Sequence, residues 1–317
     1  MKAYCYRIVD GQAEAIDLDR AMAEQCQLVW VHLPQIDAET IAWLHDVAQL
    51  DDYIVDALTA TETRPRCEAI GHGAFLNLRG RSHDPLDSSD LLASVRIWAV
   101  KGRCYSVTRK PMIAVGVVKE EVAKGEIRDP GDLITAFAAA ITNDLDPDVA
   151  DLGDQLDDCE ERLDPNHVFD LRRTVSKVRV AAITYRRFLS PQRAALEKLA
   201  SLSGDWLGDD DRLHIAAAAD RAARMAEELE SIRERSALMH ETLSDLRAEQ
   251  IDSRSLVISI VAMVFLPLTF LTGLYGMNVE GLPFAKEPWA FDMIAGMCIA
   301  ISVGVIGWFL RKHWFSG

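Results

Sequence analysis

A run of about twenty residues without a charge, from Ser255 to Leu274, most strongly constrains what this chain can fold into. Its side chains are mostly apolar, and an α-helix of that length crosses a hydrocarbon core of roughly 30 Å. We interpret residues 255–274 as a membrane span. Mostly small or hydroxyl-bearing side chains recur along it at steps of three and four, which gives the helix one narrow, partly polar face that can line water. This face consists of Ser255, Ser259, Ala262, Leu266, Thr269, Gly273 and Gly276.

A second apolar segment, residues 291–310, is again long enough to span a membrane. The two spans are joined by the short loop 275–290 and followed by the basic tail 311–317. Arginine and lysine flank the spans on the side of the chain termini, whereas the loop has only Lys286. By the positive-inside rule, we expect a multi-pass protein of the cell membrane, the inner membrane where there are two, with both termini in the cytoplasm and the loop outside.

The charge of the chain is concentrated before the spans. The net charge is −15, and residues 255–317 contribute nothing to it because their three basic and three acidic residues cancel. An acidic soluble part argues against nucleic-acid binding, which needs a basic surface. It suits a protein that gathers cations, although solubility alone explains it as well. The six cysteines are scattered without a CxxC pair, as in reduced cytosolic proteins.

Residues 1–130 are typical of a cytoplasmic α/β domain, a mixed sheet covered by helices. Four short segments rich in β-branched and aromatic residues predict strands. They are residues 28–33, 74–79, 94–100 and 103–108. Asp37 is a plausible N-cap for a helix between the first two.

Residues 131–254 predict a helical and stalk region without strands. No Gly or Pro occurs from Asp209 until Pro267, so one helix of about 85 Å is expected, at 1.5 Å per residue, to continue into the first span. It carries a heptad seam for packing against other helices. The seam is Ile215, Ala218, Ala222, Met225, Leu229, Ile232, Ser236, Met239, Leu243 and Leu246.

An acidic helix is predicted from Leu133 to Leu163, with a basic partner helix over residues 169–200. Carboxylates three and four residues apart share a helix face, where they repel one another unless cations lie between them. A regulatory metal site is therefore one interpretation, and a solvated acidic face is the other. The candidate ligands are Asp151, Asp154, Asp157 and Asp158.

Two helices cannot enclose a pore, so conduction requires a symmetric ring in which each subunit supplies the same helix. Neither span has an internal Asp, Glu, His or Lys beyond Asp292 at the edge of the second, so no charged relay lies within the hydrocarbon. A cation would meet hydroxyls, backbone carbonyls and, at the outer mouth, the amide of Asn278. These groups suit a small divalent ion that keeps its water.

The triplet Gly276-Met277-Asn278 closes the first of the two C-terminal spans. Together with FLPLTFLTGLYGMN, the long stalk and the basic-aromatic end, it resembles the CorA-type metal ion transporter superfamily over essentially the whole chain. The resemblance implies a funnel-shaped homopentamer with an αβα cytoplasmic domain and a stalk helix that runs into the pore helix. It also implies that Gly276, Met277 and Asn278 form a selectivity filter with a ring of Asn278 side chains at the outer mouth.

Within that superfamily, the N-terminal half is most similar to the ZntB zinc-transport branch. This resemblance implies zinc transport, with coupling of uptake to protons as a further expectation. The similar segments are Thr63-Arg64-Pro65-Arg66, Leu78-Arg79-Gly80, Arg96-Ile97-Trp98, Ser106-Val107-Thr108-Arg109 and Ser190-Pro191-Gln192-Arg193. Glu280, which would attract cations to the outer loop, resembles the magnesium branch instead. A magnesium or cobalt channel is therefore the alternative. Zinc prefers nitrogen and sulfur ligands, which the pore face lacks, but this matters little if the ion passes hydrated.

Other classes of function find less support in the sequence. A membrane-anchored signalling protein without a pore would leave almost no external sensing region, and no nucleophile elbow, HExxH motif or phosphate loop indicates an enzyme. No cofactor is expected beyond the transported Zn or Mg cation. Cys67 with His72 matches no standard metal spacing. Four arginines are expected to be structural ion-pair partners rather than anion ligands, namely Arg64, Arg66, Arg79 and Arg96.

Overall fold

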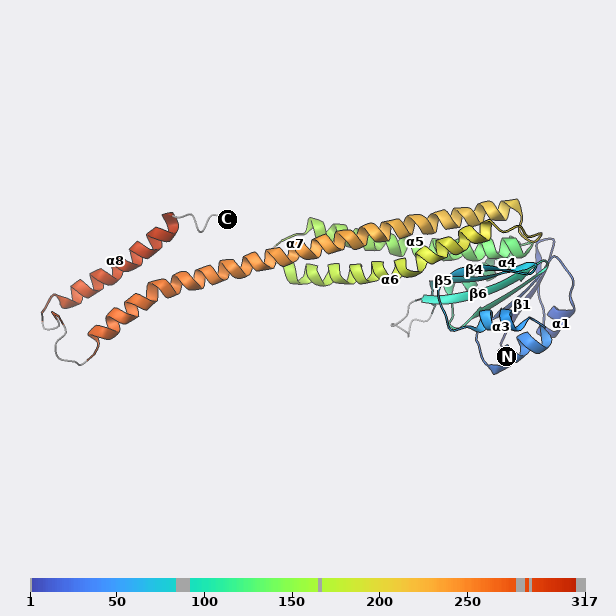
Figure 1. Ribbon diagram of the computed structural model, residues 1–317, viewed down its shortest axis with the longest axis horizontal. Coiled ribbons are helices and arrows are strands. Elements are labelled where there is room, and N and C mark those ends of the chain that lie inside the picture. Colours follow the sequence, from blue (N-terminus) through green and yellow to red (C-terminus); the bar gives the residue numbers. More distant parts are fainter. Residues whose placement is uncertain (1, 84–91, 165–166, 278–282, 285–286, 312–317) are drawn as a thin grey trace. The chain divides into compact units, whose positions relative to one another are not determined.

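The computed structural model describes residues 2–83, 92–164, 167–277, 283–284 and 287–311. The chain divides into two compact units (Figure 1). The sheet unit comprises Met1–Leu163 and Phe169–His240, and the apolar unit comprises Asp164–Val168 and Glu241–Gly317. The long helix α7, Asp209–Tyr275, contributes to both units.

Within the described residues, seven strands form one sheet in the order β2-β1-β3-β7-β6-β5-β4. β3 and β7 pair in parallel, and the other neighbours pair antiparallel, so the predicted mixed sheet is confirmed. The strands are β1 (Tyr4–Val9), β2 (Gln12–Ala15), β3 (Leu28–Leu33), β4 (Arg66–Ile70), β5 (Gly73–Arg81), β6 (Leu92–Val100) and β7 (Arg103–Thr108).

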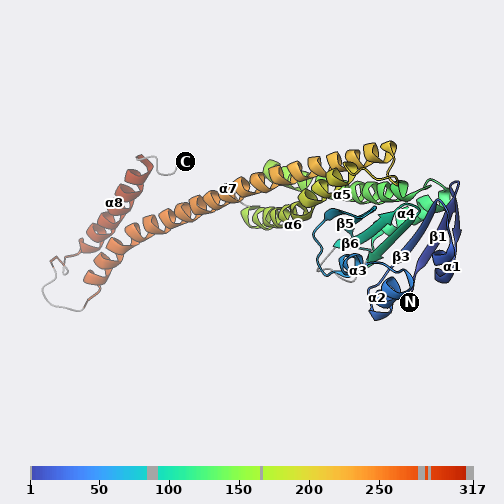
Figure 2. The ribbon, with the colours of Figure 1, turned by 45° about the vertical axis from the view of Figure 1, so that its right-hand side comes forward.

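Helices cover both faces of the sheet (Figure 2). Successive side chains of a strand point to opposite faces. Val29, Val31 and Leu33 of β3 therefore share a core with α2 (Ala38–Ala42), the π-helical turn η1 (Trp43–Val47) and α3 (Asp52–Thr59). On the other face Trp30 packs edge-on against Phe137 of α5, with ring centres 5.9 Å apart. That face is covered by α4 (Ile113–Lys124) and α5 (Pro130–Glu161), and α1 (Leu18–Ala23) lies beside β1.

The start of α2 follows from one side chain. Asp37 accepts a hydrogen bond of 2.7 Å from the backbone N–H of Thr40, which confirms the predicted N-cap. The helix then continues as η1 rather than as regular α-helix.

The helices α5, α6 (Val168–Ala200) and the N-terminal part of α7 are joined by charged contacts. Arg221 and Arg235 of α7 contact Asn143 and Glu160 of α5, so these two helices run parallel. Arg186 of α6 pairs with Glu230 of α7 at 3.0 Å. The predicted seam residues from Ile215 to Met239 are at most 6% exposed, which places them in the helix–helix interfaces.

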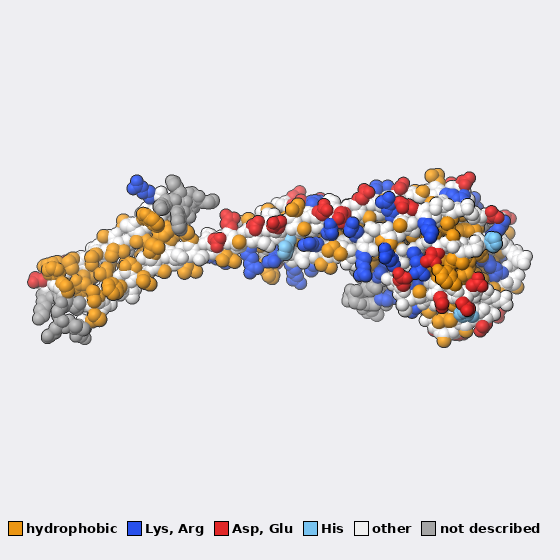
Figure 3. Space-filling view, viewed as in Figure 1, with side chains coloured by type: hydrophobic (Ala, Val, Ile, Leu, Met, Phe, Trp, Pro, Cys, Tyr) orange, Lys and Arg blue, Asp and Glu red, His pale blue; other side chains and the backbone are white. Residues whose placement is uncertain are grey.

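The apolar unit contains the C-terminal part of α7 and the helix α8 (Ala290–Arg311). Both are long and apolar enough to cross a membrane, and their most apolar windows are 0% and 6% buried. Figure 3 shows hydrophobic side chains gathered over these segments, whereas charged side chains are frequent over the remainder. Such a continuous apolar surface requires lipid or other protein to cover it.

Candidate functional site

The predicted water-lining residues lie on one side of α7. Ser255, Ser259, Ala262, Leu266, Thr269 and Gly273 are all exposed. The half-buried residues of the same segment form a second stripe, and at 3.6 residues per turn this stripe lies on the opposite side of the helix. It consists of Leu256, Ile260, Val264, Pro267, Leu268, Leu271 and Leu274. The structure thus brings the predicted face together and leaves it uncovered within one subunit.

The hydroxyl groups of this face are oriented by the helix itself. Ser259 Oγ donates to the carbonyl oxygen of Ser255 at 2.9 Å, and Thr269 Oγ1 donates to that of Phe265 at 2.8 Å. Because each hydroxyl hydrogen is used within the helix, the oxygen lone pairs remain available as acceptors. The water shell of a cation presents its hydrogens outward. The face is therefore suited to contact a hydrated cation.

The helix ends at the predicted filter. The N–H of Gly276 donates to the carbonyl of Thr272 at 2.9 Å, which extends the helical hydrogen bonding one residue past Tyr275. Met277 follows and is 48% exposed. Asn278 and Glu280 lie outside the described residues, so their roles remain predictions.

The four candidate regulatory carboxylates are all exposed on α5. Asp157 forms an ion pair with Arg235 of α7, and Asp158 lies 3.8 Å from Arg162. Asp151 accepts a hydrogen bond of 2.7 Å from Gln155. No ion pair of Asp154 occurs among the described residues. The structure therefore uses Asp157 to join two helices and leaves the other three facing outward.

A second acidic cluster was not predicted from the sequence. Asp129, Asp132 and Asp211 offer carboxylate oxygens that all lie within 4.8 Å of one another. Asp129 caps α5, and Asp211 accepts the N–H of Gly208 at 2.8 Å in the first turn of α7. The burial of Asp211, followed by the nearby carboxylates, raises its pKa to about 6, against the opposing effect of the Gly208 hydrogen bond. Helix capping accounts for these positions, and Arg128 already pairs with Asp132 at 2.9 Å.

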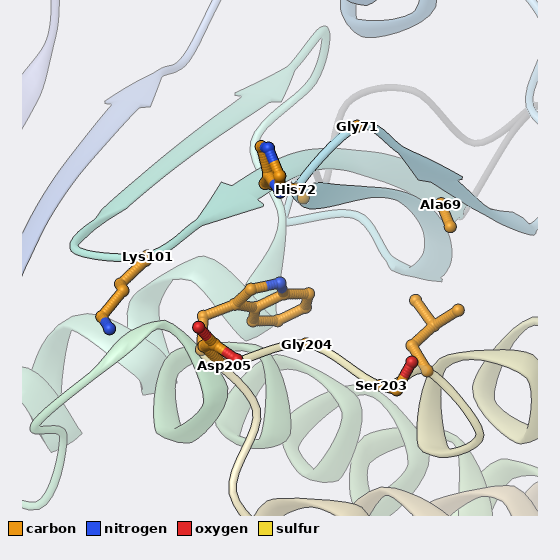
Figure 4. Close-up of a pocket in the computed structure, with 10 residues that line it drawn as sticks. Ala69, Gly71, His72, Lys101, Ser203, Gly204 and Asp205 are labelled. Atoms are coloured by element: carbon orange, nitrogen blue, oxygen red, sulfur yellow. The ribbon is translucent and has the colours of Figure 1, made fainter.

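The structure gives no support to Cys67 and His72 as a pair of metal ligands. Burial raises the pKa of the Cys67 thiol to about 11, whereas a metal ligand must be a thiolate. His72 instead borders a separate cavity of about 440 Å³. Figure 4 shows its imidazole on the strand side, opposite the loop that carries Ser203 and Asp205. A single histidine with one carboxylate makes no standard site.

The arginines predicted to form ion pairs have different surroundings. Arg66 pairs with Glu62 at 2.6 Å and with Glu68 at 3.1 Å, which confirms the prediction for this residue. Arg96 is 1% exposed and donates to a backbone carbonyl, that of Glu62, at 2.9 Å. No carboxylate pairs with Arg96 in the described part of the chain, so the prediction is wrong there.

Comparison with known proteins gives consistent matches over the whole chain. A sequence model of the family described as "CorA-like Mg2+ transporter protein" matches residues 25–312. The "Zinc transport protein ZntB" of Yersinia pseudotuberculosis is 29% identical over 321 residues, which cover 98% of this chain and 95% of that protein.

Solved structures agree with the fold described above. The full-length CmaX protein is 27% identical, with a TM-score of 0.78, and the match covers 99% of this chain and 98% of that one. The CorA magnesium transporter from Methanocaldococcus jannaschii has a TM-score of 0.81 with 99% of both chains covered. Its identity of 16% supports the fold alone.

Proposed function

Because this chain belongs to the CorA-like Mg2+ transporter family, we propose that it carries divalent cations, zinc in particular, through a ring of identical subunits. The family consists of metal transporters, so the chain is a transporter and not an enzyme. The observation that carries the proposal is the exposed face of α7, whose hydroxyl oxygens are free to accept hydrogen bonds.

Geometry supports the proposed ring. A single subunit leaves the face of α7 uncovered, and two spans cannot surround a channel. Identical copies placed around an axis would turn the same face of each α7 toward it. We expect five copies, both termini in the cytoplasm, and a ring of Asn278 amides at the outer mouth beside Glu280. Gly276 and Met277, which follow the last residue of α7, would form the selectivity filter together with this ring.

Zinc is favoured by the names of the relatives that match nearly the full length. The α7 face offers oxygen, whereas zinc prefers nitrogen and sulfur, so we infer that the ion passes with its water shell intact. Magnesium or cobalt is the alternative ion. The same hydrated passage suits magnesium, which releases water reluctantly. Coupling to protons would need a site other than an intramembrane carboxylate.

The test is ion uptake into proteoliposomes that contain the purified full chain. Zinc and magnesium are compared, each with and without an inward proton gradient. Zinc uptake that rises with the gradient supports the proposal in full, and magnesium uptake indifferent to pH supports the alternative ion. Asn278→Ala should abolish uptake while leaving the oligomer intact in size-exclusion chromatography. Unchanged uptake by this variant would refute the filter.

We also propose that the outward-facing carboxylates of α5 bind cytoplasmic divalent ions and thereby favour the closed state. The support is that Asp154 has no ion pair among the described residues and that Asp151 and Asp158 are exposed. The combined change of these three residues to Asn should weaken the inhibition of uptake by divalent ions on the cytoplasmic side. Asp157→Asn should have little effect on that inhibition, because Arg235 already neutralises this carboxylate. Inhibition that persists in the triple variant would contradict the idea.

A further inference from the structure

A cavity of about 500 Å³ lies in the sheet unit. It is bounded by the loop after α3, by the end of β5 and by α6. Each of these elements supplies one arginine, namely Arg64, Arg79 and Arg187, and Thr63 and Thr184 add hydroxyls. The described lining contains no carboxylate. A cavity of this volume is in the range of small-molecule sites.

Two of these arginines have no acidic partner in the part of the chain that the structure describes. Among the described residues, neither Arg64 nor Arg187 forms an ion pair, although acidic residues outnumber basic ones by 49 to 34. Their sequence neighbours behave differently: Arg66 pairs with Glu62, and Arg186 pairs with Glu230 at 3.0 Å. The surroundings of the cavity are therefore locally basic in an acidic protein.

Arg96 adds positive charge behind the loop. One of its terminal nitrogens donates to the carbonyl of Glu62, the residue before Thr63, at 2.9 Å. Its Nε and Nη1 are buried without a hydrogen-bond partner in the described part of the chain. Burial, followed by the charges of Arg109 and Arg66, lowers the pKa of Arg96 to about 10, so it stays protonated at neutral pH. A buried charge without a counter-ion is unfavourable, and an anion nearby would relieve it.

Contacts within the protein position Arg79 before any ligand binds. Its Nη1 donates to Thr63 Oγ1 at 3.0 Å, and its guanidinium lies 5.9 Å from the ring centre of Phe188. Its backbone N–H donates to Gln192 Oε1 of α6 at 2.8 Å. The cavity thus lies at the joint between α6 and the edge of the sheet. A ligand there would contact both elements at once.

The guanidinium group presents its donors in a planar fork that matches phosphate oxygens. We propose that this cavity binds a phosphate-bearing small molecule, whose phosphoryl groups are held by Arg64, Arg79 and Arg187. Free diphosphate and a nucleotide share this chemistry. Because the ligand would bridge α6 and β5, binding should also stabilise the folded chain.

The experiment is calorimetric titration of the full chain in detergent, with a metal chelator present and chloride held constant. The probes are inorganic pyrophosphate, ADP and adenosine. We expect pyrophosphate and ADP to bind and to raise the unfolding temperature, and adenosine to do neither. Tighter binding of ADP than of pyrophosphate would identify a nucleotide as the source of the phosphate, and equal or weaker binding would identify free phosphates.

Arg64→Gln combined with Arg187→Gln should weaken pyrophosphate binding at least tenfold. Both side chains are exposed, so folding should be preserved. Arg193→Gln is the matched control, because Arg193 lies on the same helix and pairs with Glu197 at 2.7 Å outside the cavity. Two results would overturn the proposal. One is absence of binding by both phosphate probes, and the other is an equal loss of affinity in the control, which would indicate attraction to net charge alone.

Discussion

The negative charge that Asp211 would carry at neutral pH is unfavourable in its buried position. It is 5% exposed beside Asp129 and Asp132, and its burial raises its pKa from 3.8 to about 6. The folded chain therefore binds this proton more readily than the unfolded chain does. The stability linked to it is fully present below about pH 3.8 and is lost as the pH rises through about 6.

Asp211→Asn should therefore stabilise the chain at pH 7.5 and have little effect near pH 4. The amide oxygen of Asn still accepts the N–H of Gly208, while the charge is gone. Since one pKa unit corresponds to about 1.4 kcal/mol, the gain is at most about 3 kcal/mol. Thermal unfolding in detergent at both pH values measures it, with the exposed neighbour change Asp210→Asn as control. A shift of equal size at both pH values would contradict the assignment.

Ser259 provides a test of the water-lining face with a close control on α8. Ser302 Oγ donates to the carbonyl of Cys298 at 2.9 Å, the same bond that Ser259 makes with Ser255. Ser259→Ala should lower uptake by roughly two- to tenfold, because a hydrogen bond is worth about 0.5–1.5 kcal/mol. Ser302→Ala should leave uptake unchanged. Equal losses in the two variants would mean that α7 does not line the path.

At the scale of elements, the edge of the sheet depends on one side chain of α6. β4 pairs with β5 only as far as Asn77, so the next outward-facing N–H of β5, that of Arg79, has no strand to bond. Gln192, which is 0% exposed, supplies the acceptor at 2.8 Å. The helix thus completes the hydrogen bonding that the shorter strand leaves open.

Gln192→Leu should therefore destabilise the chain by about 1–3 kcal/mol, the cost of a buried N–H left without an acceptor. The unfolding temperature in detergent should fall, without loss of the oligomer. Gln155→Leu on α5 is the control, since Gln155 is exposed and bonds only to Asp151. An unfolding temperature of the Gln192 variant no lower than that of the control would show that water satisfies this N–H instead.

The helices and strands that were predicted are those whose own residues indicate the structure, without contacts from elsewhere in the chain. The long helix and the two apolar spans follow from composition, and β3, β5, β6 and β7 follow from runs of buried β-branched and aromatic residues. β2 was missed because Gln12–Ala15 is fully exposed and contains none of these residues. It is a strand only because β1 pairs with it. β1 and β4 were missed for a related reason, since tertiary pairing decides short strands.

The same distinction holds for the sites. The hydroxyl-bearing face of α7 depends only on the periodicity of one helix, so it can be predicted from the sequence. The cluster of Asp129, Asp132 and Asp211 joins the starts of two helices, and Arg64 meets Arg187 only when α6 packs on the sheet. A local sequence pattern does not predict contacts between residues that lie far apart in the chain. These arginines were expected to pair with carboxylates. Arg66 does so, whereas Arg64 has no such pair among the described residues.

At the scale of the whole molecule, the subunit is incomplete by itself. The most apolar windows of α7 and α8 are almost entirely exposed, and the hydroxyl-bearing face of α7 is exposed as well. Lipid can cover apolar side chains but offers no hydrogen bonds to a row of oxygens. In the proposed ring, identical subunits around a water-filled axis would provide what both surfaces need.

This arrangement makes a quantitative prediction for mixed assemblies. If all subunits share one path, a single Asn278→Ala subunit should impair the whole ring. When native and variant chains are mixed equally before assembly, a ring of five is entirely native in only about 3% of cases. Zinc uptake per subunit should then fall far below half of the native value. Differently tagged chains, co-expressed, co-purified and reconstituted, provide the measurement, and mixing after assembly is the control. Uptake that falls only in proportion to the variant fraction would show that each subunit has its own path, and the shared axis would be wrong.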